Sequence, residues 1–173
     1  MANNVNQAEI QKFVNHIKSN PQDAKRSKRI EGEWVFEEGK PQFHAALSFQ
    51  KGRTTLECEL PHFAGGWGGA PDPVQYCLYG LAACYASTFV AAATSIGVEL
   101  TILKIVAENQ MNLTKQLGLS SENIIENVRF TVIAKGNASN EVMQRVKEMA
   151  DQRCPGVECI TRSIPLVTEL VWK

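Results

Sequence analysis

The chain has 173 residues, of which 44% are hydrophobic and 21% are charged, as in ordinary soluble globular proteins. This length predicts one principal domain with enough chain to bury a core. The 18 basic and 18 acidic residues cancel, which argues against a nucleic-acid partner because such proteins need a basic surface to meet the phosphates. No stretch reaches the ~20 apolar residues that span a bilayer, and the first twenty residues lack a signal-peptide pattern. We therefore expect a cytoplasmic protein with no membrane partner.

Residues 1–30 are expected to form a helical extension outside the principal domain. Between residues 7 and 19 the apolar side chains share one helical face, formed by Ile10, Phe13, Val14 and Ile17. Asn20-Pro21 ends this helix, and the basic run 25–29 is interpreted as a solvated linker rather than a nucleic-acid contact. We expect the helix to dock on the rest of the protein itself, with an arm that contacts another partner as the alternative.

Three short strands separated by turns are predicted between residues 32 and 60. They are expected at 34–36, 43–49 and 54–60, where they form a three-stranded meander. The last strand alternates Leu56, Cys58 and Leu60 with Thr55, Glu57 and Glu59. This is the period of a half-buried strand, so we expect Cys58 to face the core and Glu59 to face solvent.

A glycine-rich loop and a long helix follow. Residues 61–71 hold four glycines and two prolines but neither of the phosphate-binding glycine patterns. Asp72-Pro73 has the residue types of an N-cap and a first helical position, and the helix is predicted to run to about Ile96, where Gly97 can cap it. Because its middle is rich in Gly, Ala, Ser and Cys, we interpret it as a buried core helix that other backbone elements approach closely.

The rest of the chain is predicted to hold two long strands, at 98–111 and 124–134, a second helix that starts within 137–141, and a last strand from Ile164 to Trp172. The second helix is expected to end before Cys154. Helices and strands neither alternate strictly nor segregate in this order. The order predicts an α+β fold in which mostly antiparallel sheets wrap a long central helix.

The five cysteines are the candidates for chemistry, because a thiolate attacks peroxides and a second thiol can then close a disulfide. Their odd number and the scattered histidines argue against a disulfide framework and a metal site, and no cofactor is expected. Cys84 lies inside the long helix. Cys154 precedes Pro155 at a turn or at the start of a short helix, whose N–H groups would favour a thiolate. For Cys77 and Cys159 two roles remain possible: each either lines the site or only packs against its neighbours.

Four motifs occur in a characteristic order: Gly65-Gly66, Asp72-Pro73, Leu81-Ala82-Ala83-Cys84 and Cys154-Pro155. In these motifs and their spacing, the chain from Gly32 onward resembles the OsmC/Ohr family of thiol-dependent hydroperoxide reductases, which places the family domain in residues 31–173. The resemblance implies a domain-swapped homodimer in which sheets from both chains wrap two long helices. It also implies that Cys84 is the peroxidatic residue and Cys154 the resolving residue, with a small-molecule hydroperoxide, chiefly an organic one, as substrate and an external thiol as reductant.

Two positions depart from the peroxidases of that family. Val74 follows the helix-starting proline where they carry a Glu, although Gln75 fits the next position. No Arg occurs near residues 42–44, where the family places the cation that lowers the pKa of the reactive cysteine; His44 is our candidate for a polar or cationic group there, or else a structural residue. Arg53 is expected to be exposed at a turn. These differences favour an alternative function, a catalytically attenuated protein that binds a small apolar ligand at the dimer interface.

Overall fold

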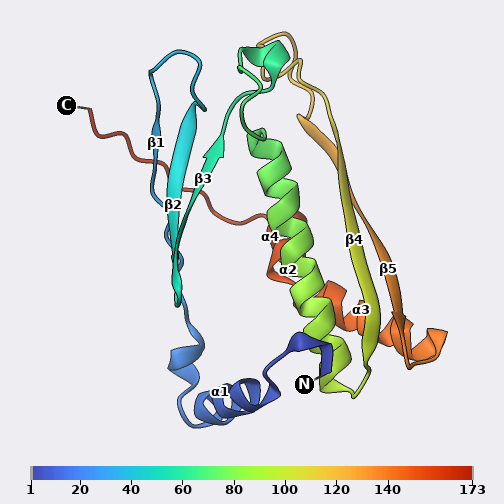
Figure 1. Ribbon diagram of the computed structural model, residues 1–173. Helices are drawn as coiled ribbons and strands as arrows, with labels where there is room; N and C mark the ends of the chain where they lie inside the picture. The colour runs from blue at the N-terminus through green and yellow to red at the C-terminus, as the bar shows by residue number, and fades with distance from the viewer. Residues whose placement is uncertain (1, 173) are drawn as a thin grey trace. The chain divides into compact units, whose positions relative to one another are not determined.

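The computed structural model describes residues 2–172, which divide into two compact units (Figure 1). One unit comprises residues 6–77, and the other comprises residues 2–5 together with residues 78–172. The division falls in the first turns of the long helix α2 (Pro73–Ser95). Every strand pair in the described part of the chain is antiparallel, and the fold is α+β, as predicted.

Residues 6–77 contain the predicted N-terminal helix and the predicted meander. Helix α1 (Gln7–Ser19) has the predicted bounds, and the side chain of Asn6 accepts a hydrogen bond from the Glu9 N–H as its N-cap. A short 3₁₀ turn, η2 (Pro21–Ala24), follows. Strands β1 (Gly32–Trp34), β2 (Phe43–Phe49) and β3 (Gly52–Cys58) pair in the order β1-β2-β3.

The first strand lies earlier in the chain than predicted. The Val35 N–H still donates to the Gln42 carbonyl at 2.7 Å, but the pairing of β1 with β2 goes no further. Phe36 therefore enters the turn between β1 and β2, where its side chain is 93% exposed. The apolar character of Phe36 suggested a strand, but turn residues 37–40 set the hairpin register and exclude it from the sheet.

Helix α2 begins as the sequence predicts. The Asp72 carboxylate accepts hydrogen bonds from the N–H groups of Val74, at 2.8 Å, and Gln75, at 3.0 Å. The Gln75 side chain in turn accepts from the Asp72 N–H at 3.0 Å, which completes a capping box. The helix ends at Ser95, and Gly97 follows with a φ of 76°, which is the left-handed conformation that commonly terminates a helix.

The unit that contains most of α2 is built from one hairpin and two further helices. Strands β4 (Leu100–Met111) and β5 (Ile125–Gly136) form the hairpin, and α3 (Asn140–Arg153) and α4 (Pro155–Thr161) follow. Helix α2 runs beside the hairpin and α3 packs near its C-terminal half (Figure 1). The buried core joins these elements through Tyr85, Phe89, Ala92, Ala93, Val98, Val146, Ala150 and Cys154.

The predicted last strand, Ile164–Trp172, is wrong for this chain. Residues 164–172 have neither helical nor strand structure, and Leu166, Leu170 and Trp172 are between 86% and 89% exposed. A strand needs a neighbouring strand to pair with its N–H and C=O groups. Among the described residues, no strand edge of the same chain pairs with this segment.

Candidate thiol site

The structure brings Cys84 and Cys154 together, although 70 positions separate them in sequence. Their Sγ atoms lie 3.7 Å apart, in hydrogen-bonding contact between sulfurs. Cys84 lies in the middle of α2 and is half-buried, whereas Cys154 lies between α3 and α4 and is only 2% exposed. A disulfide bond is about 2.05 Å long, so a shift of less than 2 Å by one sulfur would let the pair bridge.

Backbone hydrogen bonds on both sides fix the position of Cys154. Its N–H donates to the Ala150 carbonyl at 3.0 Å and so ends α3. Its own carbonyl accepts from the Glu158 N–H at 3.0 Å and so begins α4. Pro155 occupies the first position of α4, where a missing N–H costs nothing and the fixed φ suits the helix. The sequence allowed either a turn or a short helix after Cys154, and the structure has the short helix.

Gly156 lets α4 approach α2 at the thiol pair. A Cβ on Gly156 would lie 3.4 Å from the Cys84 Cβ, 3.5 Å from the Cys154 Sγ and 3.3 Å from a Leu81 methyl group. With only hydrogen at this position, the Gly156 N–H lies close enough to the Cys84 sulfur to act as a donor that lowers its pKa. This donor favours the thiolate of Cys84, because a hydrogen bond to the charged form stabilises that form.

Burial has the opposite effect on Cys84. Desolvation of the sulfur is the largest influence on its pKa and raises it above the ordinary thiol value. The Gly156 N–H lowers the pKa in part, and the neighbouring thiols of Cys154 and Cys159 raise it further. The resting site of one chain therefore holds Cys84 mainly as a thiol at neutral pH.

A second polar contact joins α2 to α3 next to Cys84. The buried Tyr85 donates its phenolic hydrogen to the Asp151 carboxylate at 2.6 Å, and Lys147 pairs with the other Asp151 oxygen at 2.6 Å. Burial, followed by the bond to Asp151, raises the pKa of Tyr85, so it remains a donor. The Tyr85 ring also lies 5.2 Å from the Phe130 ring on β5. This contact holds the end of α3, and hence Cys154, against α2.

The remaining cysteines differ in exposure. Cys58 is half-buried on β3, in line with the predicted core-facing position, and burial, followed by the charge of Asp72, raises its pKa. Cys77 and Cys159 are both exposed. In the described part of the chain, no group of three His, Cys, Asp or Glu side chains is arranged to hold a metal ion.

Sequence reasoning missed Glu59, whose side chain was expected to face solvent. Strand β3 ends at Cys58, so the alternation of faces stops, and Glu59 is buried with only 2% exposure. Its carboxylate accepts hydrogen bonds from the N–H groups of Trp67, Gly69 and Ala70 in the glycine-rich loop. Burial alone would raise the pKa of Glu59, but these backbone donors outweigh it and hold the pKa below its usual range.

The glycine-rich loop folds around this carboxylate. Gly66 lies so close to the Leu60 carbonyl that any Cβ there would overlap the oxygen. A short turn of backbone with several N–H groups aimed at one point is a typical anion-binding concavity, and here the chain supplies its own anion. The sequence does hold a signal that could have revealed this arrangement, a carboxylate placed just before a loop with four glycines.

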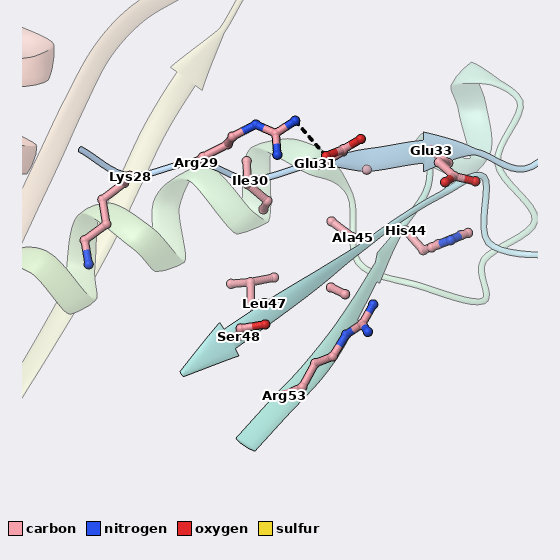
Figure 2. Close-up of a pocket in the computed structure, with 12 residues that line it drawn as sticks. Lys28, Arg29, Ile30, Glu31, Glu33, His44, Ala45, Leu47, Ser48 and Arg53 are labelled. Atoms are coloured by element: carbon pink, nitrogen blue, oxygen red, sulfur yellow. Dashed lines mark ion pairs between the residues drawn. The ribbon is translucent and has the colours of Figure 1, made fainter. Parts of the chain in front are cut away.

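His44 lies in the unit of residues 6–77, on β2. Its register partners are Glu33 on β1 and Glu57 on β3, so acidic residues flank it on both sides. With Arg53, which is exposed on β3, it lines an open pocket of about 900 Å³ on the sheet. Figure 2 shows His44 beside Glu33 in this pocket, with Arg29 paired to Glu31 at 2.7 Å farther along. A role for His44 at the thiol site remains a prediction.

The fold and the paired thiols define a class of protein: an α+β chain with a cysteine in a long small-residue helix and a second cysteine before a proline. The family model described as OsmC-like protein matches residues 66–169. The chain belongs to this family, as its motifs predicted. No curated protein matches the sequence.

Solved structures of the same fold agree with this assignment. An OsmC-like protein from Mycoplasma pneumoniae is 18% identical, with a TM-score of 0.55 over 78% of this chain and 89% of that one. An organic hydroperoxide resistance protein OsmC from Legionella pneumophila is 20% identical, with a TM-score of 0.57 over 79% and 92%. An OsmC-like protein of unknown function from Vibrio cholerae is 12% identical, with a TM-score of 0.56 over 79% and 95%. These likenesses show the OsmC-like fold.

Helix α2 is long and apolar enough to cross a membrane by length and composition. The core helix of a soluble protein can have the same properties, so they are weak evidence for a membrane span. Within one chain, the prediction of a buried core helix holds only for part of α2, where Tyr85, Phe89, Ala92 and Ala93 are buried. Only 22% of its most apolar window is buried within one chain, so most of the helix is left for other contacts.

Proposed function

We propose that this protein reduces organic hydroperoxides by a dithiol–disulfide cycle between Cys84 and Cys154. The observation that carries the proposal is the 3.7 Å separation of the two sulfurs beside the N–H of Gly156. Family membership and the name of the Legionella protein support a role in hydroperoxide resistance. The apolar residues around Cys84 favour an organic rather than an inorganic peroxide.

The cycle has three balanced steps. The Cys84 thiolate attacks the distal oxygen of the hydroperoxide, the O–O bond breaks, and the alcohol leaves after taking up a proton, so that Cys84 becomes a sulfenic acid. The Cys154 thiol then attacks the Cys84 sulfur, water leaves, and the disulfide forms. An external dithiol finally reduces this disulfide and becomes a disulfide itself. The short separation of the sulfurs favours the second step, because it requires little movement.

The active form is proposed to be a cytoplasmic homodimer with exchanged elements. Two features of the single chain support this assembly: the exposed surface of α2 and the unpaired apolar segment 164–172. A soluble protein rarely exposes a continuous apolar surface without a partner for it. In such a dimer the extension 1–30 is proposed to dock on the assembly, and His44 to lie near a thiol site.

The test is peroxide consumption by the purified protein with an organic hydroperoxide and a small dithiol. Cys84→Ser should abolish turnover, and Cys154→Ser should allow one oxidation of Cys84 without forming the bridge. Cys77→Ser is the matched control, because Cys77 is exposed on the same helix, and it should retain full turnover. Turnover that persists in Cys84→Ser would overturn the proposal.

A second candidate function has its own observation. The raised pKa of Cys84 and the presence of Val74 in place of a Glu favour a slow thiol at neutral pH. The protein would then bind a small apolar ligand at the dimer interface instead of turning over peroxide. Hydrogen peroxide and organic hydroperoxide would both react with Cys84 at the rate of an ordinary buried thiol, while an apolar ligand would raise the melting temperature.

A further inference from the structure

We infer that Cys159 is a third redox thiol, which accepts the disulfide from Cys154 and presents it to the external reductant. The inference rests on the proposed dithiol cycle and extends it to the reductive half. It assigns a role to an exposed cysteine that the peroxide-reducing steps leave unused.

Helix α4 places three residues of this inference close together in the chain. Cys154 is its N-cap, Gly156 packs against Cys84, and Cys159 follows one turn after Gly156. Residues three apart share a helix face, with Cβ atoms about 5–6 Å apart. Since a Cβ on Gly156 would lie 3.4 Å from the Cys84 Cβ, the Cys159 Cβ lies within roughly 9 Å of it.

The electrostatics of the site agree with this placement. After desolvation, the charges of Cys154 and Cys159 are among the influences that raise the pKa of Cys84. A negative charge on Cys159 is the smallest of these influences, in keeping with a place near Cys84 but outside direct contact. The disulfide geometry of about 3.8 Å between Cβ atoms requires the last turn of α4 to move inward. This seven-residue helix ends at Thr161 and is followed by irregular chain, and helices so short are marginally stable by themselves.

Access explains why a third thiol would be needed. Cys154 is only 2% exposed and Cys84 is half-buried, so a bulky dithiol reaches neither sulfur of their disulfide easily. The Cys159 thiolate would attack the Cys84 sulfur, and Cys154 would leave as a thiolate and take up a proton. An external dithiol then attacks the exposed Cys159 sulfur, is oxidised to its own disulfide, and returns Cys84 and Cys159 to thiols.

One arm of the test traps the intermediate. In Cys77→Ser/Cys154→Ser, one equivalent of an aromatic disulfide reagent converts either Cys84 or the exposed Cys159 to a mixed disulfide without any peroxide. The other of these two thiols should displace the reagent, releasing a second equivalent of its coloured thiolate, and digestion without reductant should yield a Cys84–Cys159 linked peptide. The linked peptide should be absent in Cys154→Ser/Cys159→Ser. Because peroxide is not used, failure here counts against the relay and not against the peroxidase cycle.

The second arm keeps Cys154 in place and so does not depend on that variant folding. The wild-type bridge is formed with diamide, and its reduction by a dithiol protein of the thioredoxin class is followed by thiol counting. Cys159→Ser should slow this reduction at least tenfold, whereas Cys77→Ser, which removes another exposed thiol, should not change it. Equal rates in the two variants, or no linked peptide in the first arm, would overturn the inference.

Discussion

The Sγ atoms of Cys84 and Cys154 lie 3.7 Å apart, and Gly156 packs so closely against both residues that a Cβ there would contact each of them within 3.5 Å. The contact joins the middle of α2 to the start of α4. It depends on three arrangements: the close approach at Gly156, the end of α3 at Arg153, and the bond between Tyr85 and Asp151. Substitutions at Gly156 and at Tyr85 test the first and the third of these arrangements.

Replacing Gly156 by Ala should slow formation of the Cys84–Cys154 disulfide. The new methyl group would meet Leu81, Cys84 and Cys154 at 3.3–3.5 Å, and overpacking of about 1 kcal/mol corresponds to roughly a fivefold change in rate. The rate is measured by diamide oxidation followed by thiol counting. Gly80→Ala is the control, since a Cβ at Gly80 meets nothing within 4 Å. Ala favours the helical conformation at both positions, so this effect is shared by the two variants. Equal bridging rates for both would therefore contradict the role of Gly156.

The alkylation rate of Cys84 should rise with pH around a midpoint above the free-thiol value of about 8.5. Desolvation raises this pKa in the folded protein, so the folded state retains the thiol proton. The associated stability is fully present below the unfolded pKa and is lost as pH rises through the folded value. The midpoint is measured by iodoacetamide labelling and peptide mapping, with urea-unfolded protein as the reference. A folded midpoint below the unfolded one would show that a further cation activates Cys84.

Tyr85→Phe should destabilise the protein by about 1–2 kcal/mol, because it removes a hydrogen bond to a carboxylate next to a packed ring. For a chain of this length the melting temperature should fall by roughly 2–4 °C for each kcal/mol. Thermal unfolding at pH 7 measures the change. Tyr79→Phe is the matched control, since the Tyr79 side chain is 72% exposed on the same helix. A similar melting temperature for both variants would show that the Asp151 contact contributes little.

Glu59→Gln should lower the melting temperature at pH 7. It should also make the melting temperature depend less on pH between pH 3 and pH 7. The wild-type carboxylate has a lowered pKa because backbone N–H groups of the loop outweigh its burial. Its contribution is therefore present above the ordinary carboxyl pKa, about 4.3, and is lost as pH falls through the lower folded value. Unfolding midpoints between pH 3 and pH 7 test this, with the exposed Glu57→Gln on β3 as control. Parallel pH curves for wild type and Glu59→Gln would contradict the prediction.

The segment 164–172 should be needed for dimerisation. The proposed dimer has a mass of about 38 kDa, twice the 19.1 kDa of one chain. Leu166 and Leu170 are at least 86% exposed, so replacing both by Ser should weaken the dimer while changing few contacts within one chain. Sedimentation across a hundredfold range of concentration measures the equilibrium, with Glu169→Gln as the control. A wild-type chain that remains at 19.1 kDa throughout would overturn the dimer.

Local signals in the sequence predicted most of the elements. The bounds of α1 and the start of α2 follow from apolar periodicity and from the Asp72 capping box, which involve residues close together in the chain. The same holds for β2 and for the end of α3 before Cys154. The last strand was wrong because strand formation depends on a distant partner, which alternation of apolar residues does not reveal.

By itself, then, the sequence determined the order of the elements as far as α3, their caps and the family, and it singled out Cys84 and Cys154 as the candidate thiols. Only the tertiary structure decided that the two sulfurs meet, that Gly156 packs against both cysteines, and that Glu59 turns inward to hold the glycine-rich loop. The physical reason is the separation in sequence between the residues that interact. Periodicity and capping act over a few residues, whereas the separation of two thiols and the burial of a carboxylate depend on how distant segments pack.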